Sequence, residues 1–303
     1  RLLYQPQKAS ISTPKGYYSP FDYLKVEYHY ILCHHPFNNY SVDIEEAMPN
    51  EPRVVFSHEL TRASYSLSLN EKRLIMYAVS KIDRKGSSNA LLEINALDCA
   101  RFYKMNETSA RRHLQHSLDA LWDRELVTAD GVGHRWIVSR GKYDQGSLFL
   151  KFHPDLEPHL LNLKSKFTQY YLARAAEFKL AYTWRLFELI MQFKSTGYLK
   201  INLDEFKKIL ELSEYYNSDF GRIRAKVINP AIKEIKVKDG LLITWNAIKK
   251  GRSVVALEFK FPVEAQQELF VIDNDYIDKH AKPGESYEQA GKRLKEEAKK
   301  QTE

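Results

Sequence analysis

The chain has 303 residues, of which 44% are apolar and 28% charged, and its 46 Lys and Arg side chains exceed 39 Asp and Glu to give a net charge of +7. This composition excludes a collagen-like or fully disordered chain, and two cysteines are too few for a disulfide framework or a four-ligand zinc site. Because no stretch approaches the roughly 20 apolar residues of a membrane-spanning helix and the N-terminus lacks a secretion signal, we expect a protein of the reducing cytosol that does not contact a membrane.

The positive charge is concentrated in the middle of the chain. Residues 57–180 carry a net charge of +5 and residues 181–261 carry +6, whereas residues 1–56 carry −1 and residues 262–303 carry −3. This distribution is expected when the middle faces a polyanion and the ends do not. Ordinary solvated lysines explain it equally well at this point. We take these four segments as the domain organisation, since at about 100 to 200 residues per domain the length indicates two domains.

Residues 1–56 are rich in Tyr, Pro and Asn and show no sustained hydrophobic period, so we interpret them as an extension without assigned structure. The following segment has a clear pattern. An amphipathic helix is predicted over Asn70–Ile82, an alternating strand over Leu92–Asn95, a short helix over Ala96–Lys104 and a basic helix over Thr108–Trp122.

The same order of elements recurs about one hundred residues later. A helix is predicted over Ala181–Phe193, a strand over Leu199–Asn202, a short helix over Leu203–Leu210 and a basic helix over Ser218–Lys236. The segments Leu92-Glu93-Ile94-Asn95 and Leu199-Lys200-Ile201-Asn202 mark the repeat most clearly.

Two alternating strands, Leu241–Ile248 and Ser253–Phe261, follow the second copy and are joined by the basic turn Lys249-Lys250-Gly251-Arg252. A helix, a strand, two helices and a two-stranded basic hairpin form the order of a winged helix. The sequence therefore predicts an α+β protein with two tandem winged-helix domains related by internal pseudo-symmetry, the first over residues 57–180 and the second over 181–261. Residues 262–303 form an acidic, mixed-charge tail, which from Ala281 onward is predicted to be a solvated helix or disordered.

On the first basic helix, the apolar residues fall within one narrow arc at 100° per residue. That arc must face the core, and the opposite side and its flank carry the first set of candidate DNA contacts: Ser109, Arg112, Gln115 and His116. In a helix-turn-helix arrangement, Arg pairs with guanine and Gln with adenine in the major groove. A solvated helix face is an equally good interpretation of this helix alone.

The outward face of the second basic helix is more uniformly positive. The apolar arc of this helix comprises Phe220, Ile223, Val227, Ala231 and Ile235, and the candidate contacts of the helix are Arg222, Arg224, Lys226, Asn229 and Lys233. An ordinary surface helix mixes charge signs, because opposite charges at four-residue spacing stabilise it, so this bias favours a polyanion. Lys249, Lys250 and Arg252 add three cations at a hairpin turn, where a wing contacts phosphates or the minor groove. Gly221 and Pro230 depart from an ideal helix, so the sequence leaves the register of the base-reading residues open.

The sequence resembles the replication initiator, or Rep, proteins of theta-replicating plasmids whose origins contain iterons. It contains several short motifs that occur in the same order as in that family. The resemblance covers roughly Ser57 to Phe261, and its most specific parts are Ala63-Ser64-Tyr65-Ser66-Leu67, Asn70-Glu71-Lys72-Arg73-Leu74, Lys166-Phe167-Thr168-Gln169-Tyr170, Arg185-Leu186-Phe187-Glu188-Leu189, and Lys249-Lys250-Gly251-Arg252 with the strand end Phe259-Lys260-Phe261.

The resemblance implies a protein of the bacterial cytosol, associated with its plasmid, that binds double-stranded origin iterons as a monomer and an inverted operator as a homodimer. The second domain would then make the main base contacts, and the first would serve DNA contact and dimerisation. It also implies origin opening with the host initiator, helicase and chaperones, and repression of the protein's own gene. A winged-helix transcriptional regulator without an initiator role remains the alternative.

A rolling-circle nuclease is a further alternative, from a different functional class. His34 and His35 are adjacent and would point to opposite faces of a strand, and His29 with Cys33 stands among aromatic residues, so neither pair indicates a metal site. No phosphate loop or nucleophile-elbow motif is present. We therefore expect no catalytic residue, no metal and no cofactor.

Overall fold

The computed structural model divides into the units Arg1–Pro49 and Asn50–Glu303, and every element given below belongs to the second unit. The described residues are 51–82, 91–141, 146–217, 219–264, 280–282, 284–286 and 289–294. The predicted extension over residues 1–56 therefore lies almost entirely outside the described residues, as do His29, Cys33, His34 and His35. Within the predicted tail, residues 289–294 are helical.

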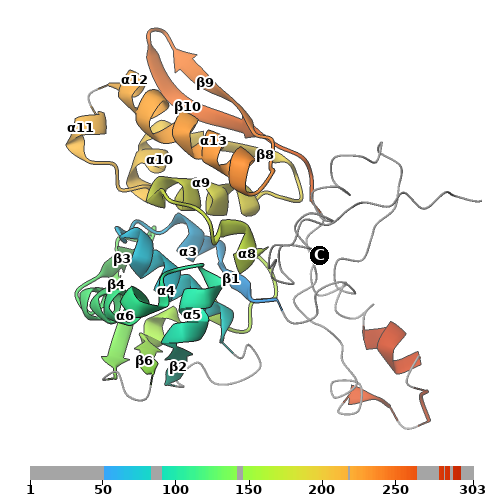
Figure 1. Ribbon diagram of the computed structural model, residues 1–303. Helices are drawn as coiled ribbons and strands as arrows, with labels where there is room; N and C mark the ends of the chain where they lie inside the picture. The colour runs from blue at the N-terminus through green and yellow to red at the C-terminus, as the bar shows by residue number, and fades with distance from the viewer. Residues whose placement is uncertain are drawn as a thin grey trace, which may run out of the picture. The chain divides into compact units, whose positions relative to one another are not determined.

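The first domain is built around a three-stranded antiparallel sheet with helices on it (Figure 1). The domain contains β1 Arg53–Ser57, α3 His58–Arg62, α4 Leu69–Ser80, β2 Leu92–Asn95, α5 Ala96–Phe102, α6 Glu107–Leu121, β3 Glu125–Val127, β4 Gly133–Arg135, β5 Ile137–Arg140, β6 Ser147–Phe152, a 3₁₀ turn Pro154–Leu156, α7 Glu157–Leu160, β7 Phe167–Tyr171 and α8 Leu172–Ala175.

The second domain repeats this plan with fewer additions (Figure 1). It contains α9 Ala181–Met191, β8 Tyr198–Asn202, α10 Leu203–Ile209, α11 Glu214–Asn217, α12 Phe220–Ile223, a π-helical segment Arg224–Ile228, α13 Asn229–Lys238, β9 Thr244–Lys250 and β10 Ser253–Lys260.

The sheets of the two domains have the same topology. The strand order is β2-β6-β5 in the first domain and β8-β10-β9 in the second, and every pairing is antiparallel. In each domain a helix, α4 or α9, precedes the first strand of the sheet, and a short helix, α5 or α10, and a longer helical segment, α6 or Phe220–Lys238, lie between that strand and the hairpin; α11 is an additional short helix of the second domain. The predicted α+β fold with two winged-helix domains and internal pseudo-symmetry is confirmed.

The first domain begins earlier than the sequence predicted. Strand β1, which starts at Arg53, pairs antiparallel with β7, from Arg53 opposite Tyr171 to Ser57 opposite Phe167. Because its apolar run Val54-Val55-Phe56 needs a partner more than one hundred residues away, local periodicity could not identify it as part of the fold. The boundary predicted at residue 57 falls at the end of this strand.

Helix α4 shows how local sequence sets an element's start. Ser68 and Glu71 form a reciprocal capping box, in which the Ser68 hydroxyl accepts from the Glu71 N–H and the Glu71 carboxylate accepts from the Ser68 N–H. The predicted helix over Asn70–Ile82 is thus observed as Leu69–Ser80.

Helix α9 lies at the junction of the two domains. Its residues Thr183–Met191 are all buried, and it contacts β7 and α3 of the first domain as well as β8 and α13 of the second. An all-round buried helix of this kind is central to a core, and here it ties the two domains together.

Candidate DNA interface

The first-domain helix α6 buries the arc that the sequence predicted. Ala110, Leu114, Leu118 and Leu121 are fully buried, and the Asn106 side chain accepts a hydrogen bond from the Ser109 N–H at 3.3 Å, so it caps the start of the helix. With the apolar arc fixed in the core, the polar residues face outward.

The candidate residues on α6 differ in how available they are. Arg112 and His116 are exposed, and Ser109 and Gln115 are half-buried. The Gln115 amide donates to the Asp119 carboxylate at 3.3 Å, and this carboxylate also pairs with Arg140 at 3.2 Å. Gln115 must therefore break an existing hydrogen bond before it reads a base.

Three further exposed arginines lie on or beside this helix, and the sequence analysis missed them. Arg111 is on α6, while Arg135 and Arg140 end the strands β4 and β5 and stack over the Trp122 ring at 5.9 and 5.1 Å. Neither strand was predicted from the sequence, so the position of the last two could not be inferred. The first domain therefore offers more cations than the predicted set.

In the second domain, α12, the π-helical segment and α13 form one helix from Phe220 to Lys238. In the π segment the Asn229 N–H bonds to the Arg224 carbonyl, five residues earlier. Pro230 follows directly, and because proline has no N–H, a widened turn is a common way to keep such a helix continuous. The two departures from an ideal helix, Gly221 and Pro230, are accommodated without interrupting it; Asp219 caps the Gly221 N–H at 2.7 Å.

The π segment widens the buried arc but leaves the candidate residues outside. Ile223, Val227, Ala231 and Ile235 are buried as predicted, and Ile228 is buried in addition. The candidate residues of this helix are all exposed: Arg222, Arg224, Lys226, Asn229 and Lys233. π-Bulges of this kind occur frequently at functional sites.

Two of these side chains are already held by neighbours. The Arg222 guanidinium lies 4.5 Å from the centre of the Tyr215 ring, donates to the Tyr215 carbonyl at 3.1 Å and stands 3.7 Å from the Asp219 carboxylate. The Asn229 side-chain oxygen Oδ1 accepts a hydrogen bond from the Trp245 indole N–H at 3.2 Å. Both are positioned at the surface rather than free to move, which lowers the entropy cost of contacting a ligand.

The remaining cations of the helix lack such neighbours. Arg224, Lys226 and Lys233 make no side-chain hydrogen bond or ion pair with any residue in the described ranges. The helix carries one acid, Glu234, and its carboxylate accepts from the N–H groups of Lys179 and Leu180. Asp239, directly after α13, pairs with Arg174. The acids are used in contacts with the first domain, and the cations remain on the exposed face.

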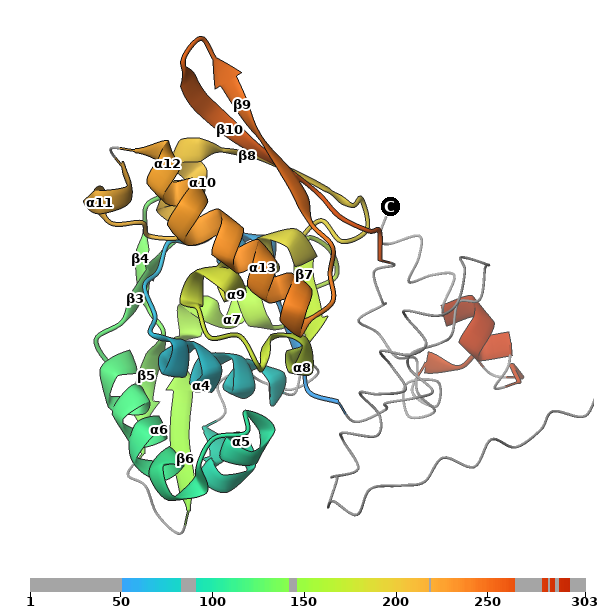
Figure 2. The same ribbon diagram turned by 45° about the horizontal axis from the view of Figure 1, so that its top comes forward.

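The hairpin β9–β10 forms the wing. Figure 2 shows it extending beyond α12 and away from the other helices of the domain. Lys250 pairs with Ser253, so the turn contains only Gly251 and Arg252, and Gly251 has a φ of 64°. A glycine at the first position of a two-residue turn is typical of a type II′ hairpin.

The bounds predicted for the strand over Leu241–Ile248 are wrong: β9 is Thr244–Lys250, and it starts at Thr244 because Thr244 opposite Lys260 is the last pair of the ladder. Lys249 and Lys250, predicted in the turn, end the strand instead, and both are exposed together with Arg252. Within the described part of the chain, none of these three side chains has an ion pair or hydrogen bond.

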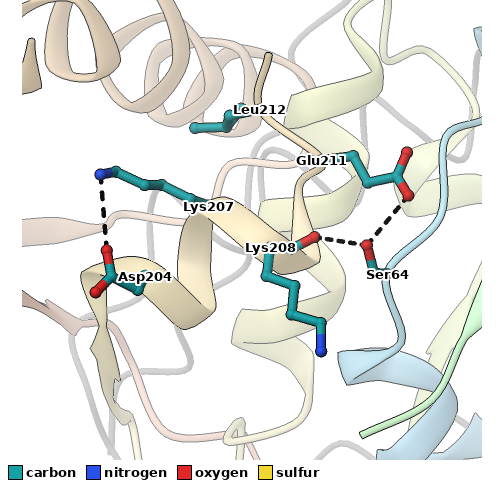
Figure 3. Close-up of a pocket in the computed structure, with 6 residues that line it drawn as sticks. All are labelled: Ser64, Asp204, Lys207, Lys208, Glu211 and Leu212. Atoms are coloured by element: carbon teal, nitrogen blue, oxygen red, sulfur yellow. Dashed lines mark hydrogen bonds and ion pairs between the residues drawn. The ribbon is translucent and has the colours of Figure 1, made fainter. Parts of the chain in front are cut away.

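A surface pocket lies where the first domain meets α10 (Figure 3). The Ser64 hydroxyl donates to the Lys208 carbonyl at 2.9 Å and to the Glu211 carboxylate at 3.1 Å, and Lys207 stands 3.7 Å from Asp204. One pair of its charged groups, Lys207 with Asp204, is thus matched, and the hydrogen bonds of Ser64 join the two domains.

Among the described residues no group of three His, Cys, Asp or Glu side chains is arranged to hold a metal ion. None of the described helices is both long and apolar enough to cross a bilayer. Cys99 is buried, and burial raises the pKa of its thiol to about 12.

Comparison with known proteins identifies both domains. The family described as "Initiator Replication protein, WH1" matches residues 53–191, and the family described as "Initiator Rep protein, WH2" matches residues 202–261. The Escherichia coli PI protein is 27% identical over 253 residues, which cover 69% of this chain and 82% of that protein. An Escherichia coli replication initiation protein is 24% identical and covers 74% of each chain.

A solved structure is also similar. The crystal structure of the Pi initiator protein in complex with iteron DNA has a TM-score of 0.62 and 25% sequence identity, and the match covers 71% of this chain and 99% of that chain. The agreement therefore extends over nearly the whole of the solved chain.

Proposed function

Because this chain belongs to the family of plasmid replication initiator proteins, with both winged-helix domains matched, we propose that it binds the repeated double-stranded DNA of a plasmid origin sequence-specifically and starts replication there. The observation that carries the proposal is the separation of charge on the second recognition helix. Its exposed face carries Arg222, Arg224, Lys226 and Lys233, while Glu234 is engaged with first-domain backbone.

We infer different roles in DNA binding for the helix and for the wing. Side chains near the start of a recognition helix reach base edges in the major groove, and an arginine there can pair with the O6 and N7 atoms of guanine. Arg222 occupies that end. The wing cations Lys249, Lys250 and Arg252 stand at a hairpin tip, where phosphates are the accessible partners.

The first domain provides a second, weaker reading surface on the same molecule. Two tandem major-groove readers cover about two helical turns, at about 10.5 base pairs per turn, so we expect direct repeats of that length in the origin. Several copies of the protein would fill the repeats and strain the duplex, and the host initiator, helicase and chaperones would act at the opened segment. The related Pi protein, crystallised with iteron DNA, supports this assignment.

We further propose that a homodimer, formed through the first domain, represses the protein's own gene in the bacterial cytosol. A transcriptional regulator without an initiator role would use the same DNA-binding residues. The two functions separate in one experiment: a plasmid carrying the repeats should replicate only when the protein is supplied. Replication without the protein would reject initiation and leave repression.

The nuclease alternative makes a chemical prediction of its own. A rolling-circle enzyme would leave the protein covalently attached to DNA in the presence of Mg²⁺ or Mn²⁺. We expect denaturing gels of such a reaction to show no covalent product, and we assign no catalytic residue or cofactor to this chain.

A further inference from the structure

One guanidinium of the first domain binds two separate parts of the second. Arg174 on α8 donates to both oxygens of Asp239, with Nε to Oδ1 at 2.7 Å and Nη2 to Oδ2 at 2.8 Å. It also donates to both oxygens of Glu264, with Nη1 to Oε2 at 2.7 Å and Nη2 to Oε1 at 3.0 Å. Asp239 directly follows α13, the last part of the recognition helix, and Glu264 lies four residues beyond the end of the wing strand β10 at Lys260. A single side chain therefore holds the segments that follow both of the proposed DNA-reading elements.

The surroundings of Arg174 favour a fixed geometry. The Asp239 side chain is only 3% exposed, and the guanidinium lies 5.3 Å from the centre of the Phe187 ring of α9. Burial alone would lower the pKa of Arg174, but the hydrogen bonds and charges of Asp239 and Glu264 raise it above its ordinary value. Bidentate Arg–carboxylate pairs are geometrically specific, because the planar fork matches both oxygens at once.

Two more polar contacts involve the C-terminal half of α13. The Glu234 carboxylate accepts from the N–H groups of Lys179 and Leu180 at 2.7 and 3.3 Å, and Lys238 pairs with Glu177 at 3.2 Å. The C-terminal half of the recognition helix is thus bound to residues 174–180 of the chain, while Arg222, Arg224 and Lys226 are exposed on its N-terminal half and Lys233 on its C-terminal half. Of these contacts, those of Arg174 also include Glu264 in the segment that follows the wing.

We propose that Arg174 is a positioning residue that fixes the second domain's recognition helix and wing relative to the first domain, and so sets the spacing between the two halves of one DNA repeat. The inference rests on the proposed function. Because about 10.5 base pairs make one helical turn, inserting one base pair between two subsites rotates one by about 34° relative to the other. A rigid connection between the two domains cannot follow that rotation, whereas a loosened connection can.

The test measures affinity as a function of subsite spacing. The probes are a fluorescent duplex carrying one direct repeat from the plasmid's origin and two derivatives with one or two base pairs inserted between the subsites, which hydroxyl-radical footprinting of the wild-type complex locates. The full chain is titrated as wild type, Arg174→Gln, Arg174→Lys and Glu264→Gln. Arg124→Gln is the matched control, because Arg124 forms a similar pair with Glu71 within the first domain, with Nη2 to Oε1 at 3.1 Å.

We expect the one-base-pair insertion to weaken wild-type binding by about tenfold or more, the size of one lost base contact. Arg174→Gln should reduce that penalty to about threefold or less, with Arg174→Lys and Glu264→Gln in between, since each keeps part of the charge pairing. Arg124→Gln should keep the wild-type penalty. Should Arg174→Gln not fold, the lysine and Glu264 variants decide the result.

An unchanged insertion penalty in the Arg174 and Glu264 variants would overturn the inference, and so would a wild-type protein that tolerates the insertions. These results differ from a failure of the proposed function. In that case the wild-type protein would bind the uninterrupted repeat no better than a shuffled duplex.

Discussion

Charged residues in two regions of this protein have opposite roles. Lys72, Arg185 and Glu188 are buried together at the domain junction, whereas Arg224, Lys226 and Lys233 lie exposed on the second recognition helix. The buried charges are paired, because an unpaired charge in a medium of low polarity is strongly unfavourable. The exposed cations have no acidic partner in the described part of the chain and are available to phosphates.

The buried region is a dense network around one carboxylate. Glu188 accepts from Lys72 at 2.8 Å, from Arg185 at 3.2 Å and from the Tyr170 hydroxyl at 3.0 Å. Arg185 also donates to the carbonyls of Ala63 and Ile209, which belong to different domains. Burial lowers the pKa of Lys72 to about 8, although the charge of Glu188 opposes this shift.

This network explains the motifs that carry the family resemblance. The segments 63–67, 70–74, 166–170 and 185–189 each supply a member of it. These four motifs therefore maintain the junction between the domains. In contrast, the fifth motif, Lys249-Lys250-Gly251-Arg252, lies outside this network, and its cations are exposed on the wing.

The largest effect is expected from a substitution in the buried network. Replacing Glu188 with Gln leaves Lys72 and Arg185 without their shared charge and should lower the free energy of unfolding by about 3 to 5 kcal/mol. Urea denaturation followed by circular dichroism measures it. Glu214→Gln, on an exposed residue of α11, should change stability by less than about 0.5 kcal/mol. Equal losses in the two variants would contradict the role given to the network.

On the exposed side, Arg222→Ala should weaken binding to the origin repeat by about 1 to 3 kcal/mol with little effect on random DNA, as for a bidentate base contact. Arg222→Lys keeps the charge but loses the planar fork, so it should show most of the same loss on the repeat. Anisotropy titrations with both duplexes measure the two affinities. Equal losses on repeat and random DNA would reject base reading by Arg222.

The wing should respond differently from the helix. Lys249→Ala or Lys250→Ala should weaken binding to repeat and random DNA alike and reduce the slope of log affinity against log salt by about one per lost phosphate contact. Lys260→Ala is the matched control, because Lys260 is an exposed lysine at the base of the same hairpin. A loss confined to the repeat would assign base reading to the wing.

The smallest effect is expected in the first domain. Gln115→Ala should cost less than about 1 kcal/mol of binding to the repeat, because its amide already bonds to Asp119 and most interface residues contribute no more. The same titrations measure it, with Arg112→Ala alongside as an exposed residue of the same helix. A loss as large as that of Arg222→Ala would show that both domains read bases equally.

The sequence by itself determined the features that depend on local periodicity. The apolar arcs of α6 and of the second recognition helix, the repeated order of elements and the basic hairpin turn were all predicted, because side chains on one face recur every 3.6 residues in a helix and every second residue in a strand. Charge counted by segment also pointed to the two central domains. The individual base-reading residues remain predictions.

Only the tertiary structure decided which residues far apart in the chain meet. The pairing of β1 with β7, the pairing of β2 with β6 and the binding of Arg174 to Asp239 and Glu264 all join segments that are distant in sequence. No local pattern encodes these partners. They also determine which acids of the recognition helix are used within the protein and hence which cations stay exposed, because an ion pair depends on distance in space and not on position along the chain.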